Sequence, residues 1–162
     1  MTNNNKNSET VGSRRQSRQL ALQFLYQLDV QKGRPIEMLD KFLAENTADL
    51  EIRKIARQWI RGTWNGLAHI DATIKEVSAN WDINRISIVD RSNLRLAIYQ
   101  LLDCPDVPAK VVINEAIELA KVFSTAQSSK FVNGVLDAVV KKMLNITEQT
   151  IDETETETEK QD

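Results

Sequence analysis

The sequence has little of what catalytic and metal sites require. It contains one cysteine and one histidine, so no disulfide can form within the chain. Cys104 lies between Asp103 and Pro105 with no histidine nearby, which is typical of a structural thiol rather than a nucleophile. His69 lacks the second histidine or cysteine that a zinc site needs. There is also no glycine-rich phosphate loop and no nucleophile elbow, so we expect no metal, no cofactor and no enzymatic activity.

Long apolar runs are absent as well. No run approaches the length needed to cross a membrane, and the polar, asparagine-rich residues 1–12 lack the apolar core of a signal peptide. The sequence therefore predicts a cytoplasmic protein. Its 162 residues are enough for one domain with a single hydrophobic core.

Helical periodicity occupies nearly all of the chain between residues 13 and 145. Apolar residues recur at spacings of three and four, and no segment shows the strict alternation of a strand. Short loops separate the segments, which predicts an all-α fold, a compact bundle of about seven helices. Trp81 is expected to close the end of this bundle. The spacing of Ser124 and Gln127 predicts a capping box that opens the last helix.

The two ends of the chain differ from the predicted domain at 13–145. Residues 1–12 are expected to form a disordered arm, and residues 146–162 a disordered acidic tail. Within the tail, residues 151–162 carry a net charge of −5, whereas the whole chain carries −2, so the other 150 residues carry +3. This mild positive charge is weak evidence for nucleic-acid binding.

One segment near the C-terminus has an aromatic residue at the edge of a helical stripe. Phe131 projects about 100° from Val132, which belongs to the apolar face, and Gln127 and Lys130 accompany it on the outer side. A ring beside a cation and amides suits stacking on an unpaired base, although a second helix could equally cover it. Gly134 indicates close approach of a backbone or ligand, since glycine within a helix costs about 1 kcal/mol relative to alanine.

The first predicted helix begins with three arginines. Arg14, Arg15 and Arg18 stand where the helix dipole favours acids, so their placement needs a reason. Guanidinium groups bind phosphates through a bidentate fork, which makes a phosphate-binding strip one explanation. A solvated basic cluster is the other. By helical projection, Leu22 and Tyr26 continue the same strip.

Two carboxylates lie one helical turn apart in the helix that follows the Pro105–Pro108 loop. Glu115 and Glu118 are expected to pair with Lys110 and Lys121 on a solvated face, rather than to form an acid–base pair.

Four motifs together resemble the NusB family of bacterial transcription antitermination factors over residues 13–145. The motifs are Arg14-Arg15-x-x-Arg18 before Ala21-Leu22-Gln23-Phe24-Leu25-Tyr26, Asp90-Arg91-x-x-Leu94-Arg95-Leu96-Ala97, Pro108-x-Lys110-Val111-x-Ile113-Asn114-Glu115-Ala116-Ile117-Glu118-Leu119-Ala120-Lys121, and Lys130-Phe131-Val132-Asn133-Gly134-Val135-Leu136-Asp137.

The resemblance implies an all-helical, non-catalytic protein that binds the boxA element of nascent RNA. It implies a partner, the small-subunit ribosomal protein NusE, and a larger complex with other Nus factors on RNA polymerase, notably in ribosomal RNA operons. The implied RNA-binding residues are Arg14, Arg15, Arg18, Tyr26, Gln127, Lys130 and Phe131. The implied NusE-binding residues are Tyr26 and Asp90.

Two alternatives remain open at this point. The chain could be a helical protein–protein scaffold, or an RNA-targeting module of a ribosomal RNA modification system, since a similar domain is attached to some RNA methyltransferases. Steep salt dependence of binding would favour RNA over a protein partner. Whether the free protein is a monomer or a homodimer is also open.

Overall fold

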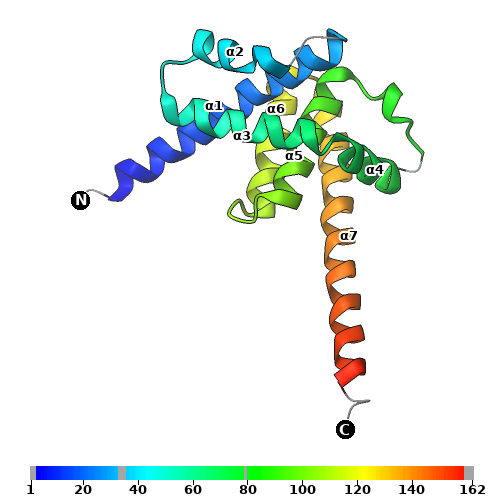
Figure 1. Ribbon diagram of the computed structural model, residues 1–162. Coiled ribbons are helices and arrows are strands. Elements are labelled where there is room, and N and C mark those ends of the chain that lie inside the picture. Colours follow the sequence, from blue (N-terminus) through cyan, green and yellow to red (C-terminus); the bar gives the residue numbers. More distant parts are fainter. Residues whose placement is uncertain (1–2, 33–35, 79, 159–162) are drawn as a thin grey trace.

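The computed structural model describes residues 3–32, 36–78 and 80–158, and these ranges contain seven α-helices, two short 3-10 helices and no strand (Figure 1). The predicted all-α bundle of about seven helices is confirmed. None of the described helices is both long enough and apolar enough to cross a membrane. The elements are α1 (Asn3–Val30), η1 (Ile36–Met38), α2 (Leu39–Asn46), α3 (Leu50–Asn65), α4 (Leu67–Val77), η2 (Ile83–Arg85), α5 (Ile88–Asp103), α6 (Ala109–Phe123) and α7 (Ala126–Thr158).

Helix α5 is the centre of the bundle. It packs against α1, α3, α4, α6 and α7, and it has no broad solvent face, because nine of its sixteen residues are buried. Its buried polar residues include Asn93, whose Nδ2 donates to the Ala116 carbonyl of α6 at 2.8 Å, which joins the two helices. The largest fully buried apolar side chains of the core are Phe24, Leu39, Leu43, Ile60, Ile70, Ile74, Leu94, Leu96, Ile98, Val112 and Leu136.

The junction between α6 and α7 differs from the predicted capping box. Ser124 ends α6, since its backbone N–H donates to the Ala120 carbonyl at 2.9 Å. Thr125 caps α7 instead, because its Oγ1 accepts a hydrogen bond from the Ser128 backbone N–H at 3.1 Å. The cap is therefore one residue later than the spacing of Ser124 and Gln127 predicted, and Gln127 takes no part in it.

Both terminal helices extend into segments that the sequence predicted to be disordered. Helix α1 begins at Asn3, and α7 continues to Thr158, well away from the rest of the bundle (Figure 1). Each extension prolongs an existing helix, and adding residues to a helix requires much less free energy than nucleating a new one. Residues 1–2 and 159–162 of the predicted arm and tail lie outside the described residues.

Two helical glycines have opposite surroundings. A Cβ at Gly134 would meet no heavy atom within 4 Å, so the predicted close approach of another backbone is wrong. A Cβ at Gly62 in α3 would lie 2.1 Å from Cζ of Tyr99. Gly62 therefore allows α3 to lie close to the Tyr99 ring of α5, and the sequence pattern did not predict this contact.

Candidate functional site

An ion pair joins the basic start of α1 to α6. Nε and Nη2 of Arg15 donate to the two carboxylate oxygens of Glu115 at 3.2 and 2.8 Å. These hydrogen bonds raise the pKa of Arg15 and lower the pKa of Glu115. Arg14 makes a longer contact, with 3.4 Å between its Nη2 and Oδ2 of Asp106; the Arg14 side chain is 37% exposed and the Asp106 side chain 70% exposed. Glu118 pairs with Lys121 as expected, whereas Glu115 pairs with Arg15 instead of a lysine.

Arg18 occupies a different environment. It is only 4% exposed, its Nε donates to Oε1 of Gln100 at 3.1 Å, and its guanidinium carbon lies 4.9 Å from the ring centroid of Trp59. Burial lowers the pKa of Arg18. Arg18 is therefore enclosed in this structure, and its expected contact with RNA phosphates stays a prediction. The residue lies at the edge of the apolar stripe, and α3 and α5 cover that edge.

Phe131 lies under a tryptophan rather than under a second helix. Its ring centroid is 5.4 Å from that of Trp81, and the two planes are tilted by 53°. Trp81 is 57% exposed, so it does not close the end of the bundle as predicted. Lys130 and Gln127 are both exposed beside this pair, as expected. The result is an aromatic pair with one half-buried ring and one exposed ring.

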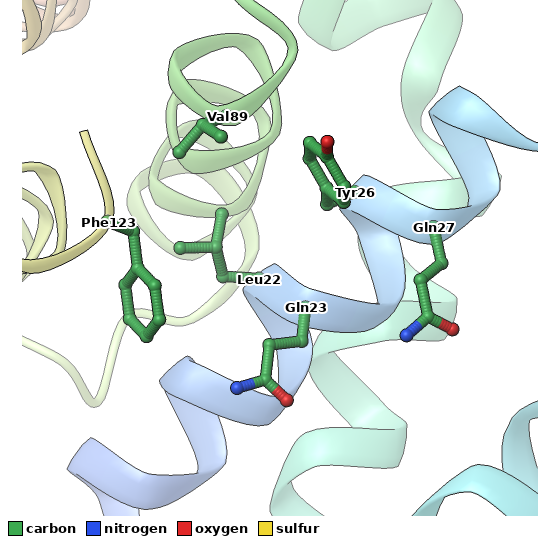
Figure 2. Close-up of a pocket in the computed structure, with 6 residues that line it drawn as sticks. All are labelled: Leu22, Gln23, Tyr26, Gln27, Val89 and Phe123. Atoms are coloured by element: carbon green, nitrogen blue, oxygen red, sulfur yellow. The ribbon is translucent and has the colours of Figure 1, made fainter.

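A mostly apolar pocket of about 290 Å³ lies further along α1 (Figure 2). Tyr26, 39% exposed, and Phe123, 38% exposed, both line it. Arg15 and Tyr26 are eleven residues apart, which places them on one face of α1 about 16 Å apart. On α6, Glu115 lies beside Arg15 and Phe123 lies beside the same pocket as Tyr26, so the two pairs follow one another along α1 and α6. Among the described residues, the lining consists of Leu22, Gln23, Tyr26 and Gln27 of α1, Val89 of α5 and Phe123 of α6.

Asp90, the residue after Val89 in α5, is buried. It is 6% exposed, and its Oδ2 accepts a hydrogen bond from Oγ of Ser128 at 2.8 Å. The Asp90 side chain therefore joins α5 to the start of α7, and its expected contact with NusE stays a prediction. Its Oδ1 has no hydrogen-bond partner among the described residues. The carboxylate borders a second pocket, of about 290 Å³, together with Trp81, Gln127 and Phe131.

Among the described side chains, no group of three or more His, Cys, Asp and Glu residues is arranged to hold a metal ion. The residues described above instead form a surface that carries cations, aromatic rings and apolar pockets. It runs along α1 and α6 and around the first turns of α5 and α7.

The sequence of the chain matches a known protein family. The family model described as "NusB family" matches residues 15–141. The chain belongs to the NusB family.

Curated NusB proteins match most of the chain. A "Transcription antitermination protein NusB" from Desulforapulum autotrophicum is 44% identical over 131 residues, which cover 80% of this chain and 92% of the relative. A protein of the same name from Syntrophus aciditrophicus is 40% identical over 138 residues, covering 85% of this chain and 86% of the relative.

Solved NusB structures have the same fold. NusB of T. maritima matches with a TM-score of 0.74 and 40% sequence identity, covering 79% of this chain and 90% of that one. A structure of the antitermination factors NusB and NusE in complex with dsRNA matches with a TM-score of 0.73 and 26% identity, covering 80% of this chain and 97% of that one.

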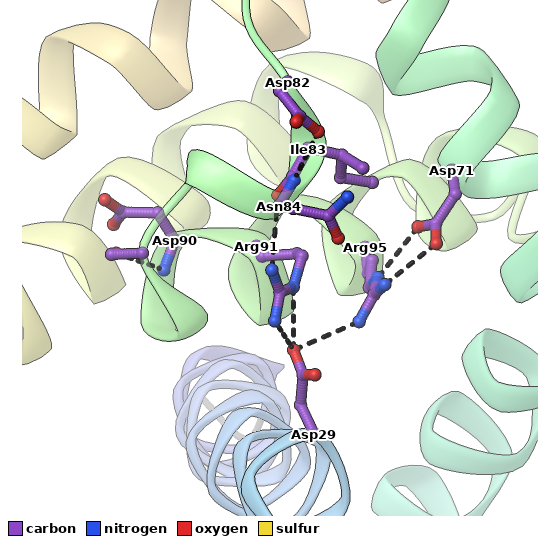
Figure 3. A network of polar contacts seen from close by, with 9 residues as sticks. Asp29, Asp71, Asp82, Ile83, Asn84, Asp90, Arg91 and Arg95 are labelled. Carbon is purple, nitrogen blue, oxygen red and sulfur yellow. Dashed lines mark hydrogen bonds and ion pairs between the residues drawn. The ribbon is translucent and has the colours of Figure 1, made fainter.

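One polar network of this NusB-family chain was not predicted from its sequence. Asp29 of α1 pairs through Oδ2 with Arg91 and Arg95 of α5, at 2.7 and 3.3 Å (Figure 3). Arg95 also forms a two-pronged contact with Asp71 of α4, at 2.8 Å for each hydrogen bond. The i, i+4 spacing of the two arginines was visible in the sequence. Their partners lie more than 20 residues away along the chain, so no local pattern identified them.

Proposed function

We propose that this chain binds boxA-type RNA of nascent transcripts together with a NusE-type ribosomal protein. Binding takes place within an antitermination complex on RNA polymerase, with other Nus factors, and it involves no catalytic step. Family membership supports the antitermination role, and the arrangement of residues on the surface supports the RNA and protein contacts.

The observation that carries the proposal is the aromatic pair of Trp81 and Phe131. Single-stranded RNA is recognised largely by stacking its splayed bases on aromatic rings, and an exposed ring resting on a half-buried one provides such a platform. The exposed ammonium group of Lys130 can hold a neighbouring phosphate. The Gln127 amide can both donate to and accept from a base edge, whereas an ionised carboxylate at that position could only accept.

Phosphate contacts are assigned to Arg14 and Arg15 on α1. Both are accessible, and neither is held by more than one carboxylate among the described residues. The apolar pocket beside Tyr26 and Phe123 suits a protein partner, because interfaces concentrate their binding energy where an apolar side chain fills a pocket. NusE would therefore lie against this pocket, next to the RNA.

Fluorescence anisotropy of a labelled boxA-type RNA tests the proposal. The RNA is titrated with this protein with and without its cognate NusE, at two salt concentrations, and a scrambled RNA of equal length serves as the control. We expect selective, salt-sensitive binding that tightens when NusE is present. Absence of selective binding even with NusE would overturn the RNA assignment and favour the protein scaffold.

Two variants test the aromatic platform. Trp81→Ala removes the exposed ring, and we expect it to weaken boxA binding by about 1–3 kcal/mol without changing the fold. Phe131→Ala is expected to weaken binding by a similar amount, but its ring also packs against the core. Circular dichroism of both variants separates lost binding from lost structure. Unchanged RNA affinity of a folded Trp81→Ala protein would exclude stacking on this residue.

A further inference from the structure

Glu115 uses only one edge of the Arg15 guanidinium. The carboxylate accepts from Nε and Nη2, which form the side edge of the group. A guanidinium also has a terminal edge, formed by Nη1 and the second N–H of Nη2, which is equally suited to a bidentate contact. No described residue hydrogen-bonds to Nη1 of Arg15. The ion pair therefore leaves a second fork available to a phosphate.

The carboxylate is the fixed member of the pair. The Glu115 side chain is 14% exposed, whereas the Arg15 side chain is 55% exposed. The hydrogen bonds from Arg15 lower the pKa of Glu115, and the nearby charges of Arg15 and of the buried Arg18 lower it further. A partly buried carboxylate on a packed helix restrains a long, exposed side chain that would otherwise sample many rotamers.

We infer that Glu115 is a positioning residue for RNA, because it holds Arg15 with its terminal fork directed outward for a backbone phosphate. The entropy of ordering Arg15 is then already lost before RNA binds, which favours binding. This inference rests on the proposed function. Glu115 makes no contact with the RNA in this arrangement and acts only through Arg15.

A double-mutant cycle tests the inference, using anisotropy of the labelled boxA RNA with NusE present. The proteins are the wild type, Glu115→Gln, Arg15→Gln and the double variant. We expect Glu115→Gln to weaken binding about three- to tenfold, the effect of losing a preorganised charge-assisted contact. In the Arg15→Gln background, Glu115→Gln should have no further effect, because the residue through which it acts is gone.

Salt dependence provides a second readout. Arg15→Gln should reduce the slope of log affinity against log salt by about 0.7, the value for one phosphate contact on single-stranded RNA. Glu115→Gln should leave the slope unchanged, because Arg15 still carries its charge. Glu118→Gln is the matched control. Glu118 lies one turn away on α6 and pairs with Lys121, so its variant should bind like the wild type.

The outcomes separate this inference from the proposed function. A wild-type protein without selective RNA binding would overturn both. Wild-type binding that Arg15→Gln weakens and Glu115→Gln leaves unchanged would overturn only the positioning role. Tighter binding by Glu115→Gln would also overturn it, since Glu115 would then compete with the phosphate for Arg15. Glu115→Asp, which keeps the carboxylate on a shorter stem, should bind with an affinity between those of Glu115→Gln and the wild type.

Discussion

Arg91 donates a hydrogen bond from Nε to Oδ2 of Asp29 at 2.8 Å, and its Nη2 forms an ion pair with the same oxygen at 2.7 Å, so Arg91 joins α5 to the end of α1. The same oxygen accepts from Arg95 at 3.3 Å, and Arg95 reaches on to Asp71 of α4 (Figure 3). One carboxylate of α1 therefore holds two arginines, one of which extends the link to α4. Less than a fifth of the surface of each side chain is exposed in Asp29, Arg91 and Arg95.

Removing the charge of Asp29 should therefore destabilise the fold. We expect Asp29→Asn to lower the free energy of unfolding by about 1–3 kcal/mol, because two largely buried arginines lose a charged partner. The urea midpoint of unfolding measures this effect. Asp40→Asn is the control: Asp40 also pairs with an arginine, Arg57, at 2.7 Å, but its side chain is 62% exposed. An exposed pair of this kind contributes about 0–1 kcal/mol. Equal losses in the two variants would contradict the prediction.

Gly62 and Gly134 should respond in opposite ways to substitution by alanine. At Gly62 a Cβ would collide with the Tyr99 ring, so Gly62→Ala should lower the free energy of unfolding by about 1–3 kcal/mol despite the better helix propensity of alanine. At Gly134 the space is open, and Gly134→Ala should stabilise the protein by about 0.4–1 kcal/mol. Thermal unfolding of both variants checks this. Similar shifts of the same sign would refute it.

The helices were predictable from sequence because their signal is local. The apolar stripe of α7 and the change of helix near Pro108 depend only on spacing and on residues within one or two turns. The terminal extensions were not predictable in this way, since polar sequences that prolong a helix have the same composition as sequences that do not fold.

The site was predictable only in part. Lys130 and Gln127 are exposed as expected, because a helical projection identifies the outer face of α7. Whether a residue at the edge of a stripe is covered depends on which helix packs there, so the burial of Arg18 could not be predicted from the projection. The partner of Glu115 lies 100 residues away along the chain, and no local rule favoured Arg15 over the nearby lysines.

The contrast between Arg15 and Arg18 gives a third prediction. Arg18→Ala removes a buried side chain that packs on Trp59 and bonds to Gln100, so we expect a loss of about 2–4 kcal/mol in the free energy of unfolding. Arg15→Ala should leave the free energy of unfolding nearly unchanged, because the Arg15 side chain is mostly exposed to solvent. Urea unfolding of the two variants measures the difference. A large loss for Arg15→Ala, or none for Arg18→Ala, would reverse the assigned roles.

Tyr99 should make stability depend on alkaline pH. Burial raises the pKa of Tyr99 to about 12, from an ordinary value of 10.0, because the phenolate is poorly solvated between α3 and α5. Above pH 10 the unfolded chain releases this proton while the folded protein keeps it, so the folded state loses stability as pH rises from 10 to 12. Below pH 10, Tyr99 is protonated in both the folded and the unfolded state, so its ionisation does not reduce the stability of the fold. Urea midpoints measured across this range, for the wild type and Tyr99→Phe, test the prediction. The phenylalanine variant has no hydroxyl to ionise, so its stability should fall less steeply over the same interval, whereas parallel curves would show that Tyr99 is not the group responsible.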